Sequence, residues 1–126
     1  MKSRSARRGD ARKAARLARH VVVEVPLEAN RSASRPAKRA EAARIGHVHA
    51  FDRADVRALC GAAGLTIEAE LTDPLPYAHH AFFARDAPAR ARAAVKTAVR
   101  RAAFRASPRR AERLFTVHYA CLARPR

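Results

Sequence analysis

Three short runs of the chain are rich in apolar residues, and each predicts a β-strand. Residues 21–25 form an almost unbroken valine run, which is typical of a strand buried on both faces, and Pro26 is expected to end it because proline cannot donate to a ladder. Apolar and polar residues alternate through 65–71, so one face of this strand is expected to be buried. Residues 114–122 are apolar on both faces, which favours the interior of a sheet.

Four other stretches have the composition or the periodicity of helices: residues 11–19, 37–44, 53–63 and 88–106. The third is the best defined, because Asp52 can cap its first turn and Gly64 can take a left-handed conformation beyond its last. Its apolar residues have the spacing of one buried stripe: Val56, Leu59, Cys60 and Ala63.

The longest predicted helix, residues 88–106, has a narrow apolar stripe that we expect to face the core. Phe104 lies off that stripe, which indicates a second contact. The segment before this helix, residues 77–86, follows a proline-rich stretch and is expected to be a loop. The stripe consists of Ala91, Val95, Ala98, Val99, Ala102 and Ala106, and the loop carries His79, His80, Phe82 and Phe83.

The chain has 126 residues, enough for one domain, and we expect residues 1–10 to form a disordered basic arm before a folded portion, 11–126. Its net charge of +16 would favour a nucleic-acid partner. However, most basic residues are arginines that occur with abundant alanine, a composition typical of GC-rich genomes. Aromatic residues are not interleaved with the arginines, and no helix-turn-helix or zinc pattern is present. Nucleic-acid binding is therefore the alternative rather than the leading hypothesis.

Cys60 and Cys121 fall on apolar faces of a predicted helix and a predicted strand, so we expect both to be core thiols in a reducing compartment. No apolar run approaches the ~20 residues that span a bilayer. The arginine-rich amino terminus also lacks the apolar core of a secretory signal. These features predict a cytoplasmic protein with no membrane partner.

The order of the elements resembles the second half of the class I S-adenosylmethionine-dependent methyltransferases of the type 11 kind, over about residues 11–125. The resemblance implies an α/β fold with a partial Rossmann-like sheet of about three strands, mixed parallel and antiparallel, and about four helices. The last strand would be antiparallel and inserted between the other two. The residues that carry the resemblance are Val22-Val23-Glu24-Val25-Pro26, Gly46-His47-Val48-His49-Ala50-Phe51-Asp52-Arg53, Leu59 and Ala63-Gly64-Leu65-Thr66-Ile67.

In that family a glycine-rich turn and an acidic strand end hold the cofactor, and both belong to the first half of the fold. None of the four glycines of this chain closely follows a hydrophobic strand. The resemblance therefore implies a C-terminal fragment of a methyltransferase, with little or no activity and no S-adenosylmethionine bound to it alone. Its methyl acceptor is unknown. Its partner would be a missing N-terminal half or another chain that pairs with an open sheet edge.

Residues just beyond the strand ends are the candidates for binding substrate, because open α/β sheets bind ligands there. Glu28 and Asn30 follow the first strand, and His47 and His49 point the same way if their segment is extended. A histidine could contact the substrate or remove a proton near neutral pH. A solvated loop, a cap or ordinary packing is the alternative. No catalytic residue is assigned, because methyl transfer depends mainly on positioning.

Two further hypotheses stay open. His47 and His49 could form a metal site with other histidines or an aspartate, although the spacing of two is short and common. Glu24, within the valine run, is a potentially buried carboxylate that would need a basic partner. The residues that could complete the metal site are His79, His80, Asp52 and His118.

Overall fold

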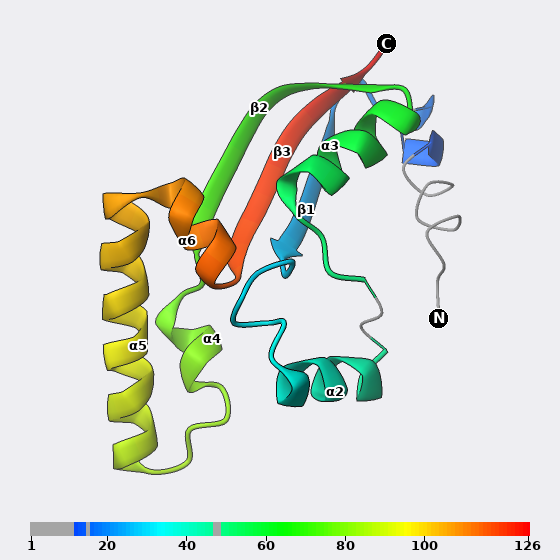
Figure 1. The fold of residues 1–126 in the computed structure, drawn as a ribbon. Helices are drawn as coiled ribbons and strands as arrows, with labels where there is room; N and C mark the ends of the chain where they lie inside the picture. Colours follow the sequence, from blue (N-terminus) through cyan, green and yellow to red (C-terminus); the bar gives the residue numbers. More distant parts are fainter. Residues whose placement is uncertain (1–11, 15, 47–48) are drawn as a thin grey trace.

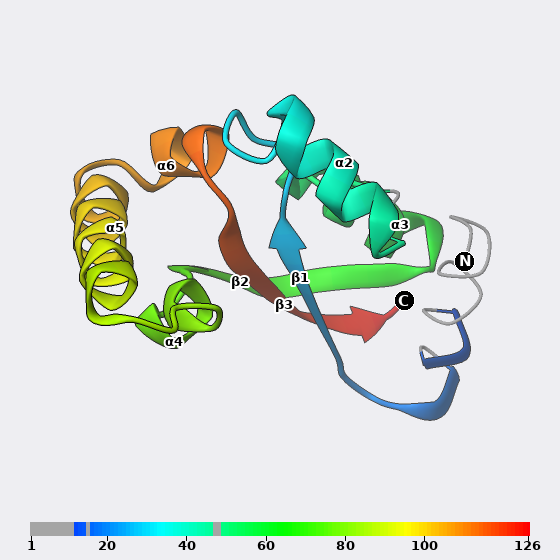
Figure 2. The same ribbon diagram turned by 90° about the horizontal axis from the view of Figure 1, so that it is seen from below.

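The structure is a computed structural model that describes residues 12–14, 16–46 and 49–126. Within them, α3 lies along a three-stranded sheet, whereas α4, α5 and α6 gather at one end of it (Figure 1). Figure 2 shows α2 and α3 on the same side of the strands. The elements are β1 (Val21–Leu27), α2 (Pro36–Arg44), α3 (Arg53–Ala62), β2 (Leu65–Pro74), α4 (Tyr77–Ala81), α5 (Ala87–Ala106), α6 (Pro108–Leu114) and β3 (Val117–Pro125).

The strand order is β1-β3-β2, and β3 is antiparallel to both neighbours. The expected mixed parallel and antiparallel, Rossmann-like sheet is therefore wrong, because both pairings in this sheet are antiparallel. The described residues also form more helices than the four expected. The prediction that the last strand lies between the other two, antiparallel, is confirmed. An isolated parallel bridge joins Leu27, the last residue of β1, to Phe51, which belongs to no named strand.

One face of the sheet holds the core. Val117, Tyr119 and Ala123 of β3 have no exposed surface, and helix α3 covers them with Val56 and Cys60. The prediction for α3 is confirmed in its detail. The Asp52 carboxylate accepts a hydrogen bond from the Asp55 N–H, and the Asp55 carboxylate accepts one from the Asp52 N–H. Gly64 follows the helix with a φ of +77°.

Strand β1 is not buried on both faces, as the valine run had predicted. Its residues alternate between half-buried and exposed, and Val22 is 61% exposed. Pro26 does not end the strand, because β1 is an edge strand that pairs only with β3, and proline is tolerated where no second neighbour needs its N–H. Glu24 is exposed, with its carboxylate 4.0 Å from His118 Nε2, so it is not a buried charge.

Strand β2 begins as predicted but changes faces halfway. The pairing with β3 shifts between Ile67 and Ala69, which is the signature of a β-bulge. Because side chains alternate along a strand, one extra residue exchanges the two faces for everything that follows. Leu71, predicted to be buried, is 65% exposed, and Glu70 pairs with Cys121 on the covered face instead.

Helix α5 is also turned relative to the prediction. Its buried face contains Ala93 and Thr97, and Phe104 packs against the core. The predicted core stripe points outward, with Val95 64% and Val99 62% exposed. The expected loop before α5 contains α4, and α6 was not predicted. Ser107 caps α6 and moves the start of the last strand from residue 114 to residue 117.

Candidate functional site

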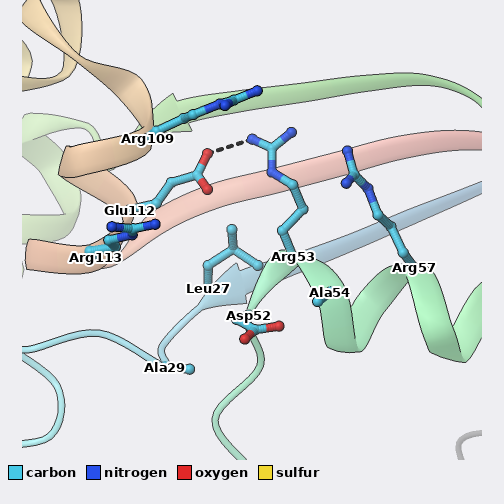
Figure 3. A pocket seen from close by; sticks show the side chains of 9 residues that line it. All are labelled: Leu27, Ala29, Asp52, Arg53, Ala54, Arg57, Arg109, Glu112 and Arg113. Atoms are coloured by element: carbon cyan, nitrogen blue, oxygen red, sulfur yellow. Dashed lines mark hydrogen bonds and ion pairs between the residues drawn. The ribbon is translucent and has the colours of Figure 1, made fainter.

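A cavity of about 350 Å³ lies where β1 ends, between the start of α3 and helix α6 (Figure 3). We call it the β1-end pocket. Its floor contains apolar side chains and its two helical walls carry the charged ones, so its polar groups come from elements far apart in the sequence. The lining residues are Leu27, Ala29, Asp52, Arg53, Ala54, Arg57, Arg109, Glu112 and Arg113.

The loop after β1 brings these elements together through Asn30, which is 4% exposed. Its Nδ2 donates to the Leu27 carbonyl (2.9 Å) and to Thr116 Oγ1 (3.0 Å), and its Oδ1 accepts from the Ala33 amide (2.9 Å). The Arg31 amide next to it donates to the Arg113 carbonyl (2.9 Å). The side chain of Asn30 therefore fixes the end of β1 against the end of α6.

A charged network fixes the α3 wall to the sheet. Arg57 donates from Nε and Nη2 to the two oxygens of Glu70, at 2.8 and 2.6 Å, and Tyr119 Oη donates to Glu70 Oε1 at 2.5 Å. Arg53 pairs with Glu112 of α6, and its Nη1 lies 3.6 Å from Glu70. The hydrogen bonds from Arg57, helped by that from Tyr119, lower the pKa of Glu70 to about 2, although burial acts against this. Glu70 is therefore ionised at any physiological pH.

The α6 wall carries two arginines with a different environment. Among the described residues, Arg109 and Arg113 have no side-chain hydrogen bond or ion pair, whereas Glu112 between them pairs with Arg53. Arg109 extends from α6 toward the side of the pocket where Arg53 lies (Figure 3). The carboxylate of Asp52 accepts from the Asp55 amide. Its lining among the described residues contains four arginines, and guanidinium groups suit the binding of an anion.

Of the four predicted substrate residues, two lie beside the β1-end pocket. Asn30 is buried in the loop beside the pocket, and Glu28 is half-buried between the lining residues Leu27 and Ala29. His49 is half-buried with its ring 6.3 Å from that of Phe51. His47 lies outside the described residues. Contact of these side chains with a substrate stays a prediction.

The histidines that could have completed a metal site lie apart. His79 and His80 are on α4, with ring centroids 5.5 Å apart, whereas His118 is on β3 beside Glu24. Among the residues that the structure describes, no three His, Cys, Asp or Glu side chains are grouped so that they could hold a metal ion.

A second charged feature lies around α5, and we call Arg35, Lys38, Lys96 and Arg100 the α5 cation cluster. Burial lowers the pKa of Lys96, and the positive charges of Arg100, Lys38 and Arg35 lower it further. Burial and Arg35 also lower the pKa of Arg100, whose guanidinium lies 5.0 Å from the ring centroid of Phe115. Among the described residues, Lys38 is the one member of the cluster with an acidic partner at close range, Glu41 at 2.9 Å. The cluster therefore holds positive charges that repel one another.

His80 lies beside the α5 cation cluster. Burial, followed by the charges of Arg100 and Lys96, lowers the pKa of His80 to about 4. Its Nε2 is buried without a hydrogen-bond partner among the described groups. The imidazole is therefore neutral at physiological pH, in a place where protonation would add one more positive charge.

Several of these residues escaped the sequence-based interpretation. Glu70 stood at a polar position of an alternating strand and was expected to face solvent. Arg53 and Arg57 are one turn apart on a helix, a spacing that indicates a shared face but does not identify its partner. Arg109 and Arg113 belong to α6, which was not predicted. The i, i+4 spacing was the signal available for these arginines.

Comparisons of the chain with protein-family models, with curated proteins and with solved structures find no match. Of the helices within the described ranges, none is both long enough and apolar enough to cross a bilayer.

Proposed function

We propose that this chain is the C-terminal portion of an S-adenosylmethionine-dependent methyltransferase, and that it completes its fold with an N-terminal portion that binds the cofactor. The resemblance of residues 46–53 and 63–67 to that family motivates the proposal. The strand order β1-β3-β2 supports it, because this is the order the resemblance implied for these three strands.

The observation that carries the proposal is the face of the sheet opposite α3, which we call the open sheet face. In the described part of the chain it exposes apolar side chains of all three strands, next to Glu24 and His118. Val22 is 61%, Leu71 65% and Leu122 37% exposed. Val22 pairs with Leu122 and Leu71 pairs with Ala120, so these side chains form one patch across all three strands. A sheet buries its apolar face against a second layer in a complete domain. The N-terminal portion supplies that layer in this proposal.

The outer edge of β1 supports the same conclusion. Strand β1 pairs only with β3 in the described sheet, which leaves one row of its backbone groups available to another strand. The candidate substrate residues Glu28 and Asn30 follow this edge strand directly. In the complete enzyme the cofactor belongs to the N-terminal portion, and the methyl acceptor enters near the end of β1. The two buried free thiols, Cys60 and Cys121, support a cytoplasmic, reducing location.

The test combines calorimetry with the DNA upstream of Met1. We expect no binding of S-adenosylmethionine to this chain alone, and an upstream segment that encodes a strand, a glycine-rich turn and an acidic strand end. The separately produced upstream segment should form a complex with this chain that binds the cofactor. Leu122→Glu on the open sheet face should prevent the complex, whereas Val95→Glu, on the outer face of α5, should not. Micromolar binding by this chain alone, or an unrelated upstream segment, would overturn the proposal.

Nucleic-acid binding is the second candidate, and the α5 cation cluster favours it. Crowded cations are stabilised when a phosphate backbone supplies the missing negative charge, and the net charge of +16 adds a long-range attraction. A fluorescent oligonucleotide titrated at two salt concentrations tests this candidate. Binding that persists at physiological salt, and that weakens about tenfold in a Lys38→Gln, Lys96→Gln variant, would support it.

The matched control for that experiment is Arg92→Gln, Arg105→Gln. Both residues are exposed arginines of α5 outside the cluster, so the control removes the same net charge. An equal loss of affinity in the two variants would attribute the binding to net charge alone and would reject the cluster as a site.

A further inference from the structure

The β1-end pocket has positive charge that the chain does not neutralise. Arg57 is held by Glu70, and Arg53 is held by Glu112. Arg109 and Arg113, one turn apart on α6, have no carboxylate partner among the described residues. Each of these two guanidinium groups lacks a counter-charge among the described residues, and a ligand with two negative charges supplies one to each.

The carboxylates of the pocket do not offset these two arginines. Glu112 is already paired with Arg53. Asp52 accepts from the Asp55 amide at 2.8 Å, and its charge is stabilised by the amino-terminal end of the ten-residue helix α3. The free positive charge therefore lies on the α6 side of the cavity.

The floor of the cavity is apolar. Leu27 is 3% exposed, and Ala29 and Ala54 lie beside it on the floor and the α3 wall (Figure 3). A volume of about 350 Å³ is in the lower range for small-molecule pockets, which span about 300–1,000 Å³. It is large enough for one small molecule.

We propose that the β1-end pocket binds a small organic phosphate. Arg109 and Arg113 contact the phosphate group, and the apolar part of the molecule lies against Leu27. A phosphate monoester is close to a dianion at pH 7, so it matches two arginines better than a monocarboxylate, which would leave one of them without a counter-charge. This site lies within the chain itself, so it does not depend on the proposed N-terminal portion.

Amide NMR titration of the full chain tests the proposal, with phenyl phosphate, benzoate and inorganic phosphate as probes. We expect phenyl phosphate to give saturable shifts at Ala29 and Ala54 and to bind about tenfold more tightly than benzoate. Inorganic phosphate should bind more weakly than phenyl phosphate, because it has no group for the apolar floor. Arg109→Gln, Arg113→Gln should weaken phenyl phosphate binding at least tenfold and reduce its advantage over benzoate.

The matched control is Arg105→Gln, Arg110→Gln, which removes two exposed arginines close in sequence but outside the pocket. It should leave the affinity for phenyl phosphate within about twofold of the unmodified chain. Equal losses in the two variants, equal affinities for phenyl phosphate and benzoate, or shifts that avoid Ala29 and Ala54 would each overturn the proposal. Arg109 and Arg113 are exposed, so neither substitution is expected to unfold the chain.

Discussion

Tyr119 Oη donates a 2.5 Å hydrogen bond to Glu70 Oε1, and the carboxylate of Glu70 lies on the face of the sheet that α3 covers. The contact exists because the β-bulge between Ile67 and Ala69 turns Glu70 inward and Leu71 outward. Glu70 in turn holds Arg57 of α3. One extra residue in β2 therefore determines both the charged network beside the β1-end pocket and the exposure of Leu71 on the open sheet face.

Replacing Glu70 with glutamine should destabilise the fold. The substitution removes the negative charge of Glu70, whose side chain is 21% exposed and which accepts hydrogen bonds from Arg57 and Tyr119. We expect a loss of about 2 kcal/mol in the free energy of unfolding at pH 7. Urea denaturation followed by circular dichroism measures it. Glu68→Gln is the control on the same strand, because Glu68 pairs near the surface with Arg124, and it should cost less than about 1 kcal/mol.

The same substitution should change the acid dependence of stability. The pKa of Glu70 is lowered in the folded state, from 4.5 to about 2, so the unfolded chain binds more protons between these values. The contribution of Glu70 is therefore complete above pH 4.5 and disappears as the pH falls toward 2. Stability of the unmodified chain should decrease more steeply over this window than that of Glu70→Gln, and parallel curves would contradict the network.

Truncation of two leucines of β2 should have very different effects on stability. Leu65 is 2% exposed in the core, and Leu65→Ala should cost about 2–5 kcal/mol because it leaves a cavity. Leu71 is 65% exposed, and Leu71→Ala in the isolated chain should change stability by less than about 0.5 kcal/mol. Similar losses of stability for both leucines would mean that the open sheet face is covered in the isolated chain. Self-association would cover it, and analytical sedimentation would detect such a form.

Asn30→Ala should unfold the loop that borders the β1-end pocket. It removes the partners of the Leu27 carbonyl, Thr116 Oγ1 and the Ala33 amide, and we expect a loss of about 2–3 kcal/mol. Thr116→Val removes one of these three contacts and should cost clearly less. Thermal denaturation of the two variants measures the difference. Unchanged stability in Asn30→Ala would favour the sequence-based role in substrate binding over a structural one.

Cys60 should resist thiol reagents in the folded chain. Burial raises the pKa of Cys60 to about 11, and the neighbouring Cys121 adds to the shift, so the thiol is almost entirely protonated at pH 8. Both thiols are buried. Labelling by a chromogenic disulfide should be at least ~100-fold slower in buffer than in concentrated urea. Rapid labelling in buffer would show that α3 separates readily from β3.

His80 should make the fold sensitive to mild acid. Burial and neighbouring cations lower the pKa of His80 from 6.5 to about 4, so the unfolded chain binds more protons between these values. Stability should be complete above pH 6.5 and should fall as the pH approaches 4. His80→Gln should remove this part of the decline in urea denaturation curves measured between pH 7 and pH 4.5. An oligonucleotide bound at the α5 cation cluster should raise the pKa of His80, which histidine NMR signals report.

The local elements of this fold were predictable where short-range chemistry decides them. Asp52 and Gly64 bound helix α3, because a capping carboxylate and a left-handed glycine act within a few residues. The apolar character of residues 114–122 correctly predicted a central strand, although β3 begins at Val117, since a strand with two neighbours has little contact with water.

What only the tertiary structure decided is which face each element turns inward. The alternation in β2 predicted Leu71 as buried, but a bulge recognisable only from its pairing with β3 exchanged the faces. Helix α5 has alanines and valines on one side and Thr97, Arg100 and Phe104 on the other, and packing against α4 and the core selected the second side. The β1-end pocket joins Arg53 to Glu112 across 59 positions of sequence. Periodicity describes each segment separately, whereas such a contact depends on how separate segments share one core.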